Sequence, residues 1–450
     1  MKRLSAAAFA LMPGSALACA LPPSVILTLP TGHYITGAAL TVAMTATLGA
    51  LTHRLPQLQA HLLHRGPDRW PLMLSSYLGF LAFAVLVGVG FFGANDPLHN
   101  LMTLVFWTGV WIALPFGSMV LGNLWRPISP WTAPVRSLRT ALGWQGTIGL
   151  SRLGHWPAAL GMAGFSWFQI VSLAPDDPGN LARVALVYWA VILLLAVAEG
   201  EEWLEKGEFL TVFFAMISRI APFWRERSGG QVATYAGWPG AQVMRMPPLD
   251  LSQMAFITLT LGALSFEGLA ETFWWLGLIG ENPLEFTGRS AVMGVNTAGL
   301  LAAWAVTALG LWAGLRLSRW LAGGGFDAGP VMLSFLAIAA GYHVAHFFVT
   351  LITTGQYTLW ALNDPLFRGD EFLGLPPFFI SFGFLTDPFF MRGVYAVQFA
   401  AILGAHLLAV VLTLKLAGAG LRARGHLPMT LLMTGYTIFG LWLMSTARGV

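Results

Sequence analysis

The chain has 450 residues and a formal net charge of +4, and only 10% of its residues are charged while 56% are hydrophobic. Soluble domains carry about 25% charged residues, so this composition excludes a water-soluble enzyme and predicts a polytopic membrane protein. The basic residues stand singly between apolar runs and form no stripe, which argues against a nucleic-acid partner.

The N-terminus has the three zones of a secretory signal peptide: Lys2 and Arg3, then an apolar stretch, then the small residues Ala16 and Ala18. We expect residues 1–18 to be removed, which makes Cys19 the first residue of the mature chain. A cysteine in this place is similar to a lipidation site, although alanine stands where leucine is usual. Because Cys19 is the only cysteine, an intramolecular disulfide and a cysteine-based zinc site are excluded.

Residues 19–450 are predicted to form a single integral membrane domain, an all-α bundle of about ten spanning segments. We place the mature N-terminus and the C-terminus outside. Seventeen of the 24 Lys and Arg residues then fall in cytoplasmic loops and five in outer loops, as the positive-inside rule requires. The expected spans are 33–52, 71–93, 101–122, 156–174, 182–204, 253–276, 291–315, 330–354, 394–416 and 428–446.

The connections contain further apolar segments. On the inner side, 135–142 has apolar residues at helical spacing and 209–223 is an apolar strip, and we expect both to lie in the membrane interface. The outer loop 355–392 is rich in aromatic residues and is interpreted either as a lid or as an interfacial aromatic belt. The spans divide five and five across 205–252, which is compatible with the inverted repeats of a transporter.

Five ionisable residues from three predicted spans fall in the outer-to-middle part of the membrane: Glu267, Glu271, His343, His346 and His406. A charge in hydrocarbon costs several kcal/mol and persists only with a partner or a role. The glutamates are four residues apart and the first two histidines three apart, so each pair lies on one helix face. Counted from the outer ends of their helices, all five fall between the outer surface and the middle of the membrane. The sequence therefore predicts a buried polar site there.

Imidazole and carboxylate groups bind zinc, manganese, copper and iron, and a bound divalent metal would offset the cost of burying the glutamates. In this interpretation His343, His346 and His406 hold the metal, which activates a water molecule, and Glu267 or Glu271 is the catalytic base or a further ligand. Two alternatives stay open. Haem b could lie between the spans of these histidines, or the cluster could hold no ligand, with the histidines hydrogen-bonded across the bundle.

Five polar residues nearer the outer surface are expected to line the access route to this cluster or to support it: His33, Asp96, His99, Asn296 and Asp364. Two of them, Asp96 and Asp364, directly precede proline. A residue in that position is pushed out of the α region and favours a turn. Turn formation is therefore the alternative role for both aspartates.

Five stretches contain residues that are unusual in transmembrane helices, such as Trp-Arg-Pro: GNLWRPISPW, AEGEEWLEKGEF, LSFEGLAETFWW, GYHVAHFF with the following TTGQ and NDPLF, and TGYTIFGLWLMS. In this order, over roughly residues 90–446, they resemble a family of bacterial polytopic membrane proteins, the fenitrothion hydrolases. The resemblance implies a multi-pass enzyme of the bacterial inner membrane. It also implies hydrolysis of an organophosphorus triester with an aryl leaving group. No catalytic residues are carried over from the family.

The sequence leaves two functions open. The first is metal-assisted hydrolysis of a small apolar substrate that enters from the lipid bilayer. The second is a proton- or metal-coupled transporter that uses the same His/Glu cluster as a relay and leaves its substrate unchanged.

Overall fold

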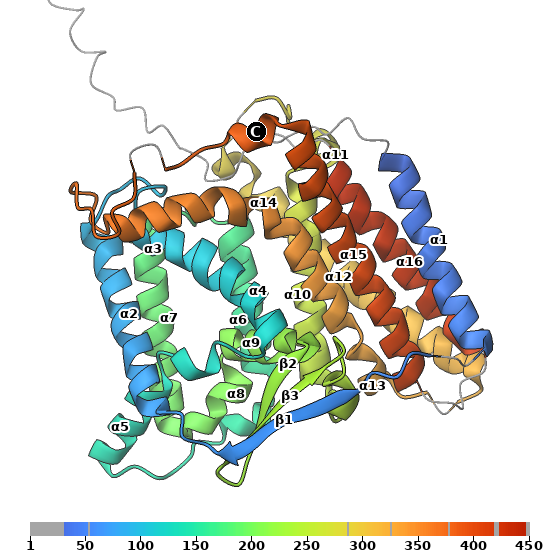
Figure 1. Cartoon of the computed structure of the whole chain (residues 1–450), viewed down its shortest axis with the longest axis horizontal. Helices are drawn as coiled ribbons and strands as arrows, with labels where there is room; N and C mark the ends of the chain where they lie inside the picture. Colours follow the sequence, from blue (N-terminus) through green and yellow to red (C-terminus); the bar gives the residue numbers. More distant parts are fainter. Residues whose placement is uncertain are drawn as a thin grey trace, which may run out of the picture.

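The computed structural model describes residues 31–52, 55–285, 288–324, 326–376, 379–417 and 423–446. The predicted signal peptide and Cys19 lie outside this part of the chain. The described residues form a helical bundle with little sheet, which confirms the all-α polytopic fold class (Figure 1). Nine helical segments in these residues are long and apolar enough to cross a membrane. They are α1 (Thr31–Thr52), α2 (Leu72–Phe92), α3 to α4 (Leu101–Leu121), α7 (Pro178–Glu199), α10 (Leu251–Ala270), α12 (Arg289–Ala322), α13 with α14 (Ala328–Asn363), α15 (Pro388–Leu416) and α16 (Ala423–Ser445).

The expected span 156–174 is replaced by α6 (Trp156–Ile170), which is not among these nine segments. Its 15 residues extend about 22 Å at 1.5 Å per residue, short of the ~30 Å hydrocarbon core. Its Ala158, Met162 and Ser166 are buried within the bundle. The described residues thus contain nine helices that are long and apolar enough to span a membrane, with the shorter α6 at the place of the fourth predicted span.

The prediction that 209–223 lies in the membrane interface is wrong. Residues Phe209–Ile217 form α9, and eight of its nine residues are buried in the main core of the bundle. The strip is apolar on every side, and a helix of that kind is stabilised by burial rather than by an interface with one polar face. The other expected interfacial segment forms α5 (Thr132–Leu142), which buries Val135 and exposes Leu138 and Leu142.

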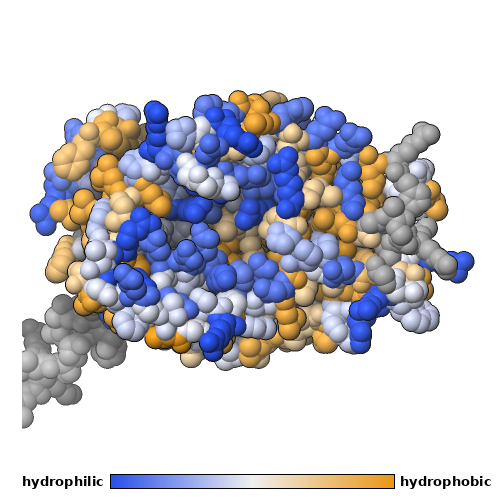
Figure 2. Space-filling view, turned by 90° about the horizontal axis from the view of Figure 1, so that it is seen from below, coloured by the Kyte–Doolittle hydropathy of each residue, from blue (hydrophilic) through white to orange (hydrophobic). Residues whose placement is uncertain are grey.

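Three strands at one end of the bundle form an antiparallel sheet that the sequence did not predict. The strands are β1 (Ala60–Pro67), β2 (Phe223–Ser228) and β3 (Gln231–Gly237), in the order β1-β3-β2. Because β1 precedes α2 and β3 precedes α10, their pairing places two expected cytoplasmic loops on the same side. Viewed from this end, hydrophilic atoms cover much of the surface and hydrophobic atoms lie mainly around it (Figure 2).

Short helices complete the connections between the long ones. The loop expected at 355–392 begins later, because α14 (Phe335–Asn363) continues to Asn363. Its C-terminal part lies across the end opposite the sheet (Figure 1), where Ala361 packs with Val89 and Leu101. The remaining short helices are α3 (Leu101–Leu104), η1 (Val105–Ala113), α4 (Leu114–Leu121), η2 (Arg126–Ile128), η3 (Leu150–Leu153), η4 (Glu201–Trp203), α8 (Leu204–Gly207), η5 (Ser218–Ile220), η6 (Val243–Arg245), α11 (Phe273–Leu278), α13 (Ala328–Met332) and η7 (Gly383–Thr386).

The centre of the bundle is formed by α10 and the α13–α14 segment. In their most apolar 18-residue stretches, 56% and 61% of the residues are buried, against 17% in α2 and in α12. The two central segments carry three of the five ionisable residues predicted for the site: Glu267, His343 and His346. The fold therefore surrounds these residues with protein, whereas α2 and α12 present most of their side chains outward.

Candidate functional site

A buried polar contact in the bundle joins α10, α14 and α6. The Oε1 atom of Glu267 lies 3.6 Å from Nε2 of His346, and the two side chains are 15% and 7% exposed. The side-chain amide of Gln169 donates a hydrogen bond of 2.7 Å to the same Oε1 atom. A carboxylate is thus held between an amide and an imidazole in the interior of a membrane protein.

Two features of the helices fix the orientation of the His346 ring. Tyr342, one turn earlier on α14, stacks on it with ring centroids 5.7 Å apart, and Phe347 packs edge-on at 4.7 Å. Tyr342 reaches this position because α10 has glycine opposite it: a Cβ at Gly268 would lie 2.3 Å from the Tyr342 hydroxyl oxygen. Gly268 follows Glu267 directly, so the close approach and the carboxylate belong to the same turn of α10.

The two nitrogens of His346 have different surroundings. Nε2 faces Glu267, while Nδ1 is buried and has no hydrogen-bond partner among the described residues. A carboxylate that faces one imidazole nitrogen favours protonation there and leaves the other nitrogen as a base, which is the logic of catalytic histidines. The 3.6 Å separation exceeds a hydrogen bond, and such contacts often shorten when substrate binds.

His343 faces a different set of elements. Its Nε2 lies 2.9 Å from the backbone carbonyl oxygen of Trp111, to which it donates a hydrogen bond. The rings of Trp111, Phe213 and Phe347 surround the imidazole at 4.7 to 5.9 Å. Trp111 belongs to η1 (Val105–Ala113), a π-helix of nine residues within the third span. Such segments are rare and are frequent at functional sites.

His406 belongs to a third interface. Its Nδ1 donates a hydrogen bond of 2.8 Å to the carbonyl oxygen of Ile402, one turn earlier on α15. Its ring approaches Tyr436 of α16 with centroids 6.5 Å apart. The Tyr436 hydroxyl in turn hydrogen-bonds with Ser265 of α10. His406 therefore lies with α16 and does not face the Glu267 pair.

The three histidines predicted as metal ligands thus have three different polar partners: Glu267, the Trp111 carbonyl and the Ile402 carbonyl. Among the described residues, no group of three or more His, Cys, Asp or Glu side chains could hold a metal ion. His343, His346 and His406 do not fit a shared divalent metal, so we derive no chemical step through one. The contacts also do not pair His343 or His346 with His406 as haem ligands would be. Metal and haem binding stay predictions from the sequence.

Glu271 is placed differently from the prediction. The α10 helix ends at Ala270, and Glu271 is its C-cap residue, followed by the short helix α11. The two glutamates are therefore not on one continuous spanning helix. The structure joins Glu267 to His346 and places Glu271 at the helix end.

The five expected access residues mainly have structural contacts. His33 is exposed in the first turn of α1. Asp96 accepts a hydrogen bond of 2.8 Å from His99 and one from the backbone N–H of Leu98, which favours the turn interpretation. Asp364 accepts hydrogen bonds from the backbone N–H groups of Arg368 and Gly369 in the loop that follows it. Asn296 accepts a hydrogen bond of 2.9 Å from Trp275 Nε1 and so links α12 to α11.

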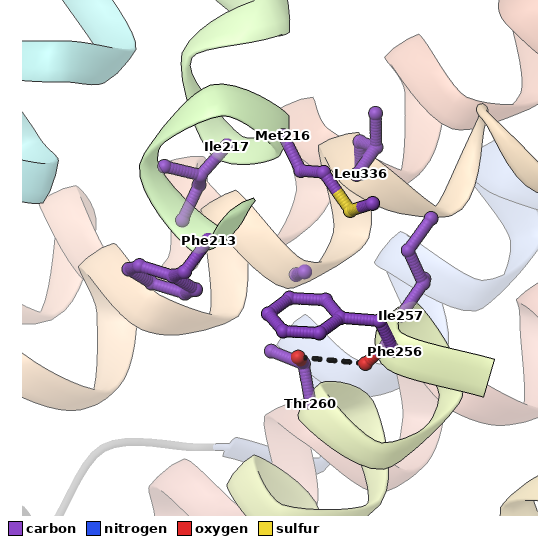
Figure 3. A pocket seen from close by; sticks show the side chains of 8 residues that line it. Phe213, Met216, Ile217, Phe256, Ile257, Thr260 and Leu336 are labelled. Carbon is purple, nitrogen blue, oxygen red and sulfur yellow. Dashed lines mark hydrogen bonds between the residues drawn. The ribbon is translucent and has the colours of Figure 1, made fainter. Parts of the chain in front are cut away.

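A small cavity in the bundle core lies away from the Glu267 pair. It has a volume of about 20 Å³, room for about one water molecule. It lies between α9, α10 and α14 (Figure 3), and its only lining hydroxyl, Thr260, donates to the carbonyl of Phe256 in its own helix. We interpret it as an apolar packing gap. It is lined by Phe213, Met216, Ile217, Phe256, Ile257, Thr260, Leu336 and Ala339.

Gln169 and Arg289 were not among the residues predicted for the site. Gln169 is the only amide side chain in the apolar helix α6, a signal that the search for ionisable residues passed over. Arg289 was assigned to an outer loop, whereas it is the first residue of α12. Its guanidinium donates hydrogen bonds to carbonyl groups at the end of α6.

Comparisons of the chain with family models, with curated proteins and with solved structures find no match. The fold and site describe a multi-pass membrane protein with a buried carboxylate–imidazole pair at its centre.

Proposed function

We propose that the chain is a membrane-embedded hydrolase of the bacterial inner membrane that cleaves an apolar organophosphorus triester with an aryl leaving group. The observation that carries the proposal is the buried contact of Glu267 with His346, in which Nδ1 of the imidazole is left as a base. The resemblance to the fenitrothion hydrolases supplies the substrate class.

The proposed reaction needs one water molecule. His346 Nδ1 takes a proton from it as the oxygen attacks phosphorus, and Glu267 stabilises the imidazolium that forms. A phosphorus–oxygen bond to the water oxygen forms while the bond to the aryl oxygen breaks. The proton then passes from His346 to the aryl oxide. The products are a phosphorus diester acid and a phenol, and no redox partner or external base is needed.

The proposed substrate class suits the position of the pair. An apolar triester partitions into the lipid around the bundle. The pair itself lies on the two most buried spanning segments, where little water competes for the base. A dry site strengthens the interaction between Glu267 and the developing imidazolium.

The test is release of nitrophenol from a dialkyl nitrophenyl phosphorothioate by the purified protein in detergent. His346→Gln and Glu267→Gln are each expected to lose about 10²-fold or more in kcat, the contribution of a positioned general base. His406→Gln is the matched control, because it changes another buried histidine at a different interface, and it should stay within twofold. Equal rates for wild type and His346→Gln would refute the assignment, as would no turnover by the folded wild type.

A proton- or metal-coupled transporter is the second candidate, and interrupted helices favour it. The third span contains the π-helix η1, and α10 ends at Ala270, so that Glu271 separates it from the short helix α11. Transporters build their substrate sites from such discontinuous helices. Pyranine-loaded proteoliposomes exposed to a pH gradient would test it: proton uptake that is lost in Glu267→Gln, without nitrophenol release, would favour the transporter over the hydrolase.

A further inference from the structure

One residue outside the Glu267 pair is connected to it through an unbroken series of hydrogen bonds. Nη1 of Arg289 lies 3.0 Å from the carbonyl oxygen of Gln169, 3.4 Å from that of Ile170 and 3.2 Å from that of Ser172. The last carbonyl groups of a helix have no partner within the helix. A cation there also interacts favourably with the helix dipole. Arg289 therefore stabilises the C-terminal end of α6.

The same turn of α6 supports Glu267. The backbone carbonyl of Gln169 accepts from Arg289, and the side-chain amide of Gln169 donates to Glu267 Oε1 at 2.7 Å. A shift of this turn moves the amide and so changes the orientation of the carboxylate that faces His346. α6 has only 15 residues, and its last turn is also held by the Trp167–Thr297 hydrogen bond and by the packing of Ile170.

We propose that Arg289 is a positioning residue of the site: by binding the end of α6, it holds the Gln169 amide against Glu267 and so orients Glu267 toward His346. The expected effect on kcat rests on the proposed hydrolase function. The positioning of Glu267 by Arg289 does not depend on that function. Arg289 takes no part in the proton transfer itself.

The structure offers a matched control for the link between α6 and α12. Trp167 Nε1 donates a hydrogen bond of 3.0 Å to the hydroxyl of Thr297, two turns further along α12 than Arg289. This bond also joins α6 to α12, but it does not touch Gln169. Thr297→Val therefore removes a comparable link between the same helices and leaves the proposed positioning intact.

The first readout is infrared spectroscopy of the full-length protein in detergent, in which the carboxyl band of Glu267 is identified by its loss in Glu267→Gln. Gln169→Leu removes the hydrogen bond directly and defines the shift of this band. Arg289→Gln is expected to shift the band in the same direction, Arg289→Lys by a smaller amount, and Thr297→Val not at all. An unshifted band in folded Arg289→Gln would overturn the proposal. If that variant does not fold, Arg289→Lys provides the same test.

The second readout is nitrophenol release. Arg289→Gln and Gln169→Leu are expected to lose about 10²-fold in kcat, the effect of a small displacement of a catalytic group, with KM within about twofold. Thr297→Val should retain the wild-type rate. A rise in KM with kcat unchanged would overturn a positioning role. If wild type itself has no hydrolase activity, the proposed function fails, while the infrared comparison still decides whether Arg289 positions Glu267.

Discussion

Gly341 of α14 lies where the two long helices α14 and α15 approach each other closely. A Cβ added at Gly341 would lie 2.2 Å from the Cβ of Ala405 and 2.5 Å from the carbonyl oxygen of Ala401. Small residues that let helix backbones approach are the usual basis of helix association in membranes. Gly341→Ala is therefore expected to separate the two helices next to His343.

The size of the effect follows from these distances. Carbon atoms in contact are about 3.5–4.0 Å apart, so the helices must separate by roughly 1.5 Å to accept the methyl group. Overpacking of a core costs typically about 1–3 kcal/mol. Because the obstructing atoms include a backbone carbonyl that cannot rotate away, we expect the upper end of that range.

The assay is reversible unfolding in mixed micelles with increasing dodecyl sulfate, which yields the free energy of unfolding of each variant. Gly355→Ala on the same helix is the control, because a Cβ there would meet no atom within 4 Å. It should stabilise the protein by roughly 0.5–1 kcal/mol through helix propensity. If Gly341→Ala unfolds with the free energy of wild type, the close approach of α14 and α15 is not as described.

Two further predictions concern packing and pH. Leu336→Ala enlarges the cavity beside Phe213 and is expected to lower the free energy of unfolding by about 2–5 kcal/mol. Leu309, 62% exposed on α12, is the control, and Leu309→Ala should change this free energy by less than about 0.5 kcal/mol. Equal effects of the two variants in the same micelle assay would contradict the core assignment. Burial lowers the pKa of His155 below its ordinary value of 6.5, against the opposing attraction of Asp250. The unfolded chain then binds more protons than the folded one, so the stability of the protein should fall as pH drops below about 6.5. If the melting temperature of His155→Gln depends on pH as strongly as that of wild type, His155 is not responsible.

The main features of the fold follow from the sequence because a lipid phase leaves few alternatives. Long apolar segments must become helices, and the nine spanning helices lie close to predicted segments. An apolar run does not by itself distinguish an interfacial helix from a buried one, which explains why α9 was misplaced. The sheet was missed although Gly229-Gly230, with φ values of +57° and +74°, is a pair typical of tight hairpins.

The site was only partly predictable, and the reason is helix rotation. Burial cost identified Glu267 and His346 as residues that need a partner, and the structure places them 3.6 Å apart. The same argument grouped His343 and His406 with them, because depth along a helix says nothing of the direction in which a side chain points. Gln169 carries no charge, so the search for ionisable groups could not find the amide that completes the cluster.

The position of α10 inside the bundle explains how the carboxylate of Glu267 is accommodated. On α2 or α12, where 17% of the most apolar stretch is buried, a glutamate would face lipid and its charge would cost several kcal/mol. Glu267 lies instead on α10, with an amide on one side and an imidazole on the other. Both partners come from helices that are distant in sequence, α6 and α14, so the environment of Glu267 exists only after the bundle has assembled. A variant that displaces α6 or α14 should therefore change the contact between Glu267 and His346 even where the protein stays folded. Arg289, which binds the end of α6, and Gly341 of α14 are the positions that test this.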